Sequence, residues 1–266
     1  MMPFNPRTKV AETLQSPPTR PQLDVEMAEL FGIYAGDGCL AFYRRGTTTD
    51  YRLTVSGSVD DFEYLERVRS IVWSRFGSFG ALKDRQLPGK KWLEFICRSK
   101  FVVDYFSKNG YLPGKKTDIG IPDWIRSNSE FSAAFIRGLF DTDGHFMLLP
   151  KGRLGLYPKF AFQFKPRRLI LELVELLRQL GFSPSIYLGV FKPDPKTGRI
   201  YEKNYAYLNG WRNFLLWREK IGSSNPKNQA RLDAAYAAFQ GPVLKPSLAG
   251  ITVPFELLLN RPTRFR

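Results

Sequence analysis

The chain has 266 residues, enough for one large or two small domains, and 40 Lys and Arg against 25 Asp and Glu give it a net charge of +15. A hydrophobic fraction of 43% excludes a disordered basic tail, and only two cysteines exclude a disulfide framework and a zinc finger. The charge favours a polyanionic partner, nucleic acid before an anionic membrane surface. No segment approaches the roughly 18 continuous apolar residues of a membrane span, so we expect a soluble intracellular protein with no membrane partner, in a prokaryotic cytoplasm or an organelle.

The first half, residues 24–122, follows a proline-containing arm over residues 1–23. Apolar spacing and turn residues predict three helices and two hairpins. The expected helices are 24–35, 60–75 and 100–108, and the expected strands are 39–43, 51–56, 79–83 and 91–98. Asp60 is the expected N-cap of the second helix. Residues 113–122 then cross to the second half.

The second half, residues 123–240, repeats this order and ends in a proline-containing basic tail over residues 241–266. The expected helices are 129–140, 166–180, 211–220 and 226–239, and the expected strands are 145–149, 158–164, 184–190 and 200–208. Pro166 is expected at the first helical position, and Asn209 is expected to cap the following helix. The sequence therefore predicts an α+β fold of two pseudo-symmetric αββαββα halves that arose by duplication.

Two short stretches repeat each other most closely, Leu30–Gly38 (LFGIYAGDG) and Ile136–Gly144 (IRGLFDTDG). They align at a spacing of 106 positions, as between Asp37 and Asp143. In this alignment small residues match small residues: Ala28, Gly32 and Gly36 fall on Ala134, Gly138 and Thr142. Small residues at every fourth position form one helix face, so we expect two helices whose backbones pack unusually close together.

Asp37 and Asp143 would then lie side by side where these two helices end. The negative end of the helix dipole and the repulsion between two charges both disfavour carboxylates there. A divalent cation would relieve both effects, and Mg²⁺ accepts paired carboxylates. Gly36 and Thr142 are the further expected metal contacts. Gly38 and Gly144 suit a left-handed helix end, although ordinary Asp-Gly turns would explain either stretch taken alone.

With both motifs in matching register, the chain resembles the LAGLIDADG homing endonucleases in their single-chain, two-motif form, over roughly residues 24–240. The resemblance implies two four-stranded antiparallel sheets that form a saddle in the DNA major groove. It also implies a monomer that makes a short staggered cut across the minor groove of a long, asymmetric double-stranded target. Asp37 and Asp143 would be the catalytic acids that bind Mg²⁺, and Mn²⁺ or Ca²⁺ can occupy such a site in vitro.

The family also places a lysine near the active centre late in each half. Residues 221–227 resemble that segment and indicate Lys227, whereas residues 110–116 leave Lys115 and Lys116 as equal candidates. Lys165 matches a polar catalytic position at the end of a strand in the second half. The first half offers only Gly57 or Ser58 there, so the two half-sites should be chemically unequal.

Basic and amide side chains on the expected strands are candidate DNA contacts. These are Arg44, Arg45, Arg52, Lys83, Arg98, Lys151, Arg153, Lys159, Gln163, Lys192 and Lys203. Arg and Lys favour guanine edges or phosphates, and the sequence does not distinguish base readout, phosphate contact and solvated surface.

The predicted activity is metal-dependent hydrolysis of a DNA phosphodiester, in which bound metal activates water and a lysine adds positive charge. The single histidine, His145, excludes nucleases built on several histidines. Two alternatives share the fold: an RNA maturase that binds intron RNA, and a DNA-binding regulator with an inactive site. The absence of a flanking splicing domain favours a free-standing, intron-encoded enzyme over an intein.

Overall fold

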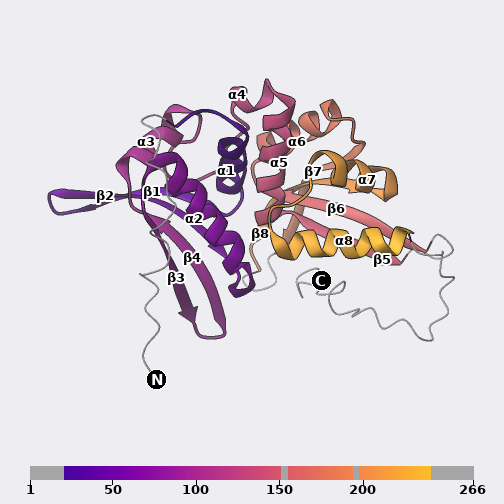
Figure 1. Ribbon diagram of the computed structural model, residues 1–266, viewed down its shortest axis with the longest axis horizontal. Coiled ribbons are helices and arrows are strands. Elements are labelled where there is room, and N and C mark those ends of the chain that lie inside the picture. Colours follow the sequence, from indigo (N-terminus) through magenta and orange to yellow (C-terminus); the bar gives the residue numbers. More distant parts are fainter. Residues whose placement is uncertain (1–20, 151–154, 194–197, 241–266) are drawn as a thin grey trace.

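The computed structural model describes residues 21–150, 155–193 and 198–240, which fold as two halves side by side (Figure 1). The first half contains α1 (Val25–Ala35), β1 (Gly38–Arg45), β2 (Thr48–Gly57), the short 3-10 helix η1 (Val59–Asp61), α2 (Phe62–Phe76), β3 (Gly80–Leu87), β4 (Lys90–Cys97) and α3 (Lys100–Lys108). The second half contains α4 (Asp123–Arg126), α5 (Ser129–Asp143), β5 (His145–Pro150), β6 (Leu156–Phe164), α6 (Arg167–Gln179), β7 (Pro184–Pro193), β8 (Ile200–Asn209), α7 (Gly210–Lys220) and α8 (Pro226–Gln240). Most of the predicted arm and the whole predicted tail lie outside the described residues.

Each half builds one four-stranded antiparallel sheet, with the same topology in both. The strand order is β1-β2-β4-β3 in the first sheet and β5-β6-β8-β7 in the second. In both sheets two consecutive hairpins join through their second strands. The predicted fold class, an α+β fold of two pseudo-symmetric halves, is therefore confirmed.

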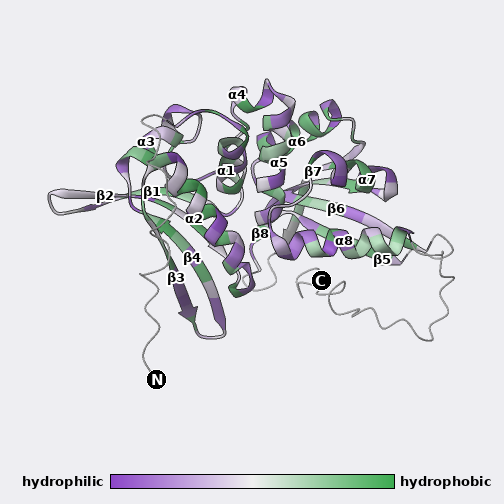
Figure 2. Ribbon diagram, viewed as in Figure 1, coloured by the Kyte–Doolittle hydropathy of each residue, from purple (hydrophilic) through white to green (hydrophobic). Residues whose placement is uncertain are grey.

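Helices cover one face of each sheet and leave the other face open. Helices α2 and α3 pack on the first sheet, and α6 and α7 pack on the second. Side chains alternate accordingly: Phe160, Phe162 and Phe164 of β6 are buried, whereas Lys159 and Gln163, at alternate positions of the same strand, are only half-buried. Figure 2 shows the same division along the chain, with the β3–β4 hairpin changing from hydrophobic near the helices to hydrophilic at its tip.

Helices α1 and α5 form the central contact between the two halves (Figure 1). A Cβ atom at Gly32 would lie 2.1 Å from the carbonyl oxygen of Phe135, and one at Gly138 would lie 2.2 Å from that of Glu29. No side chain fits into either space. The close approach of the two backbones predicted from the small residues is confirmed.

The prediction of left-handed glycines at the ends of these helices is wrong. Gly36 caps α1 with φ −76°, Gly144 caps α5 with φ −75°, and Gly38 also lacks a positive φ. The chain instead turns directly back against the last helical turn. A Cβ at Gly38 would lie 2.4 Å from Cα of Tyr34, so the missing side chain, rather than a special φ, explains the glycine.

Three local predictions need correction. Asp60 does not cap α2, because Ser58 and Asp61 form a capping box around η1 just before it. Pro166 occupies the N-cap of α6, and Arg167 is its first residue. The crossing segment is followed by a short helix, α4, that the sequence did not predict. No helix of the described chain is long and apolar enough to cross a membrane.

Candidate active site

Asp37 and Asp143 lie at the same end of the α1–α5 pair. Asp143 is the last residue of α5, and Asp37 follows the residue that caps α1 and precedes β1. A Cβ placed on Gly36 would lie 3.4 Å from Oδ2 of Asp143, so the two motifs bring their acids to one place. Both carboxylates reach solvent, as a site that binds a ligand requires.

The protein around these two acids makes their ionised forms unfavourable. Burial first, and then the charge of Asp143, raise the pKa of Asp37 to about 7, although Lys116 opposes this shift. Burial also raises the pKa of Asp143, again against Lys116. Although each side chain is partly open to water, the packed helix ends around it remove enough hydration to produce this shift.

Lys116 lies beside the acids, whereas Lys115 does not. Nζ of Lys116 donates to the carbonyl oxygens of Tyr34 (3.0 Å), Ala35 (3.1 Å) and Gly36, the last carbonyls of α1. Burial lowers the pKa of Lys116, and the charges of Asp143 and Asp37 oppose that change. Lys115 is exposed and makes no such contact, so the geometry separates the two candidates that the sequence left equal.

A cleft of about 290 Å³ extends from Asp143 to the second sheet. Its lining includes Gly36, Lys116 and Asp143 on one side and Gln163, Lys165 and Lys203 on the other. Nζ of Lys165 lies 4.3 Å from the ring centroid of Tyr201. The cleft therefore combines a carboxylate with several positive charges, as a phosphate next to a metal would require.

Lys227 belongs to the second half and is paired with an acid of the first half. Its Nζ lies 2.5 Å from Oδ1 of Asp61 and 3.3 Å from Oγ of Ser58. Burial alone would raise the pKa of Asp61, but hydrogen bonds from Lys227, Ser58 and Asn225 outweigh it and the pKa is lowered. Sequence reasoning missed Asp61; the Ser58-x-x-Asp61 capping pattern was the available signal.

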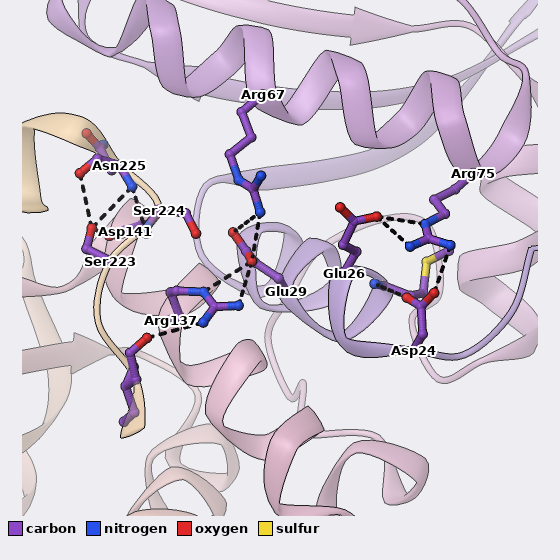
Figure 3. Close-up of polar contacts among 12 residues, drawn as sticks. Asp24, Glu26, Glu29, Arg67, Arg75, Arg137, Asp141, Ser223, Ser224 and Asn225 are labelled. Carbon is purple, nitrogen blue, oxygen red and sulfur yellow. Dashed lines mark hydrogen bonds and ion pairs between the residues drawn. The ribbon is translucent and has the colours of Figure 1, made fainter. Parts of the chain in front are cut away.

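A second unpredicted acid, Asp141, holds the loop of residues 221–225, which leads into α8 and so to Lys227 (Figure 3). The carboxylate of Asp141 accepts hydrogen bonds from the Ser223 hydroxyl, from the backbone N–H of Ser224 (2.7 Å) and Asn225 (3.1 Å), and from the Asn228 amide (3.2 Å). Burial raises the pKa of Asp141, and these hydrogen bonds oppose the change. In the motif alignment Asp141 falls on Ala35, so the first half lacks this support.

A buried ion network ties the motif helices together above the site (Figure 3). The fully buried carboxylate of Glu29, on α1, accepts from Arg137 on α5 at 2.9 Å and from Arg67 on α2 at 3.2 Å. Arg137 also donates to the carbonyl oxygen of Ile221 at 3.2 Å. The network therefore reaches Ile221, at the start of the loop that leads into α8.

The residues present fit a divalent cation held by two protein carboxylates. Within the described residues no group of three or more His, Cys, Asp or Glu side chains could hold a metal alone. The remaining ligands would therefore come from backbone carbonyls, water or a substrate phosphate, as is common for Mg²⁺. The Gly36 carbonyl already accepts from Lys116, and the Thr142 hydroxyl donates within α5 to Gly138 at 3.0 Å.

On the first sheet two of the five predicted contacts, Arg52 and Arg98, are paired with an acid. Nε of Arg52 donates to Asp50 at 2.8 Å, and Nε of Arg98 lies 3.8 Å from the same carboxylate. Lys83 is exposed on β3. Arg44 does not share the open face, because strand alternation places it on the same side of β1 as the buried Leu40, the side that the helices cover. The side chain of Arg45 lies outside the described structure.

On the second sheet the open face carries lysines against tyrosine rings. Nζ of Lys159 lies 3.8 Å from the ring centroid of Tyr207, and β8 also places Lys203 and Tyr205 on this face. Gln163 shares the face and lines the cleft. The predicted contacts Lys151 and Arg153, and the side chain of Lys192, lie outside what the structure describes.

Comparison with known proteins identifies this architecture. The family model described as a LAGLIDADG-like domain matches residues 130–222. The chain has a two-motif LAGLIDADG fold. Its structure is similar to that of the homing endonuclease I-DmoI in complex with DNA and Ca (18% identity, TM-score 0.56, 79% of this chain and 97% of that chain). It is also similar to I-DmoI in complex with DNA and Mn (19% identity, TM-score 0.52, 74% and 97%) and to the meganuclease I-SmaMI bound to uncleaveable DNA (13% identity, TM-score 0.50, 81% and 91%).

These comparisons confirm the resemblance predicted from the two motifs. The LAGLIDADG-like match covers the second motif, and the structural matches extend over both halves. At identities below a fifth these matches concern the fold, so the roles of individual residues in this chain rest on its own geometry.

Proposed function

We propose that this chain is a site-specific DNA endonuclease that uses a divalent cation, with Mg²⁺ as the physiological ion, to cut both strands of a long asymmetric target as a monomer. The observation that carries the proposal is the meeting of Asp37 and Asp143 at the end of two closely packed helices, with Lys116 against the same helix end. The DNA complexes of I-DmoI and I-SmaMI support it, as do the Mn and Ca of the I-DmoI complexes.

The chain's own residues would divide the work of phosphodiester hydrolysis. Asp37 and Asp143 would hold the cation, which when bound lowers the pKa of a water and stabilises charge on the leaving oxygen. Lys116 would add fixed positive charge near one scissile phosphate, and Lys227 near the other. The open faces of the two sheets would bind the duplex on either side, because each carries basic side chains that the core does not use.

The proposal is tested by incubating the protein with a randomised duplex library in Mg²⁺ or EDTA. We expect Mg²⁺-dependent double-strand cutting at one long site, lost in Asp37→Asn and Asp143→Asn while DNA binding persists. Asp118→Asn, an exposed acid between the halves, is the matched control and should cut normally. Tight binding without cutting under any divalent ion would refute the nuclease and favour the regulator or the maturase, with intron RNA as the next ligand.

The same assay tests the assignment of Lys116. Replacing one charge that stabilises a transition state typically lowers turnover about 10²- to 10³-fold. We expect a loss of this order for Lys116→Met and little change for Lys115→Met, whose side chain is exposed. Equal losses in the two variants would contradict the assignment.

A further inference from the structure

A polar bridge joins the two halves next to the paired acids. Asp61 ends η1, directly after the first sheet's β2, and Lys227 lies in the first turn of α8 in the second half. Their side chains are 13% and 33% exposed, and Nζ to Oδ1 is 2.5 Å. The end of β2 connects this bridge to the first acid, because the backbone N–H of Ser56 donates to the carbonyl oxygen of Asp37 at 3.5 Å. The charge of Asp61 also contributes to the raised pKa of Asp37.

The Asp61 carboxylate is held in place independently of Lys227. Its Oδ2 accepts from the backbone N–H of Ser58 at 2.8 Å and from the Ser58 hydroxyl at 2.6 Å. Its Oδ1 also accepts from the Asn225 amide at 3.1 Å. A lysine side chain is long and has many rotamers, so a fixed partner of this kind decides where its ammonium group lies.

The lysine of the first half is held in a different way. Lys116 donates to three backbone carbonyls of α1, and the described part of the chain shows no ion pair to it within 4.0 Å. Backbone carbonyls stay in place whichever side chains are exchanged, whereas Lys227 is held by two side chains, the carboxylate of Asp61 and the hydroxyl of Ser58. The two lysines can therefore be perturbed separately.

We propose that Asp61 is a positioning residue that holds Lys227 in its half of the active centre, so that cutting of one DNA strand depends on Asp61 and cutting of the other does not. The inference rests on the proposed nuclease function. It assigns a role to an acid outside both motifs and makes the two half-sites unequal for a stated physical reason.

The test measures the rates at which the two strands are nicked, in single turnover, on a duplex selected in the library experiment and labelled differently on each strand. We expect Asp61→Asn to slow one strand about tenfold to hundredfold, the cost of a misplaced charge, and the other by less than about twofold. Lys227→Met should slow the same strand, and adding Asp61→Asn to it should have no further effect. Asp60→Asn, the exposed neighbour in η1, is the control and should leave both rates unchanged.

A merely structural bridge would give a different pattern. Equal slowing of both strands by Asp61→Asn, unchanged rates, or effects of Asp61→Asn and Lys227→Met that multiply in the double variant would each overturn the positioning role. Thermal unfolding of each variant shows whether an equal loss comes from a weakened fold. A wild-type protein that cuts neither strand would refute the proposed function and the inference together, whereas a cutting wild type with an unchanged strand ratio refutes the inference alone.

Discussion

Glu29 offers a sharp test of what holds the two halves together. Its carboxylate is fully buried and accepts four hydrogen bonds. Nε and Nη2 of Arg137 donate to Oε2 (3.1 and 2.9 Å), and Nη2 of Arg67 donates to both Oε2 and Oε1 (3.2 and 3.4 Å). In Glu29→Gln the charge is lost and one oxygen becomes an amide N–H₂, which would face a guanidinium donor. Both arginines would then lack their counter-charge in a tightly packed interface.

Removing one partner of a buried ion pair typically costs about 3–5 kcal/mol. The side chains of Arg67 and Arg137 are 39% and 22% exposed, so water can hydrate part of the charge that is left unpaired. We therefore expect Glu29→Gln to lower the free energy of unfolding by about 2–3 kcal/mol, after this discount for solvent screening.

Glu26→Gln is a matched control in the same helix. Glu26 also pairs with an arginine of α2, Arg75, but at 42% side-chain exposure, and Arg75 keeps a second partner in Asp24 at 2.8 Å. An exposed pair of this kind contributes at most about 1 kcal/mol. The assay is urea unfolding of both variants, and a change in midpoint at constant slope reports stability. Losses that agree within about 0.5 kcal/mol would refute the reasoning that burial makes the Glu29 network decisive.

Three further predictions follow from the contacts described. At an uncrowded helix position Gly32→Ala would raise the free energy of unfolding by about 1 kcal/mol. Here the added Cβ would lie 2.1 Å from the Phe135 carbonyl oxygen, so we expect urea unfolding to show a net loss of about 1–3 kcal/mol. A net gain in stability would contradict the close packing. Because the pKa of folded Asp37 is raised to about 7, protonated Asp37 contributes stability to the metal-free protein. This contribution is full below the ordinary carboxyl pKa of about 4 and is lost as the pH rises through about 7. Asp37→Asn should flatten this dependence, and Mg²⁺ should raise the unfolding temperature more above pH 7 than below it; identical pH profiles would contradict the shift. Lys203 lies on the open face of the second sheet, so Lys203→Gln should weaken DNA binding and reduce the slope of log affinity against log salt by about 1. The control Lys108→Gln, on α3, should change neither quantity. Equal slopes for the two variants would exclude a phosphate contact at Lys203.

The fold was predictable because its signals are local and occur twice. The close packing of the central helices follows from small residues at 28, 32 and 36 and at 134, 138 and 142. The hairpins follow from the alternation of side chains and from turn residues. Asp37 and Asp143 could be paired from the sequence alone, since a repeated motif at one register places equivalent residues at equivalent ends. That the two hairpins of each half join into one four-stranded sheet came from the family resemblance, and the order of the strands came from the structure.

The supports of the site could not be predicted, because they join residues far apart in the chain. Glu29 contacts Arg137, and Asp61 contacts Lys227, across separations of more than a hundred positions. Each acid has an ordinary local explanation, as a helix residue or a cap, so neither is marked in the sequence. Lys115 and Lys116 illustrate the same limit: adjacent lysines have equal local patterns, and only the path of the loop over the end of α1 separates them.

Under the proposed function, the unequal supports would let a duplicated fold act on an asymmetric substrate. The helix interface has no room for a side chain at Gly32 or Gly138, because a Cβ there would overlap backbone atoms of the partner helix. The groups that place the two lysines face no such restriction, because each acts on one side chain at the edge of the interface. The first half therefore uses backbone carbonyls for Lys116, and the second uses the carboxylate of Asp61 for Lys227. Under the proposed function, the common centre would fix where hydrolysis occurs, and the separate supports would let the cutting rate of each strand change independently.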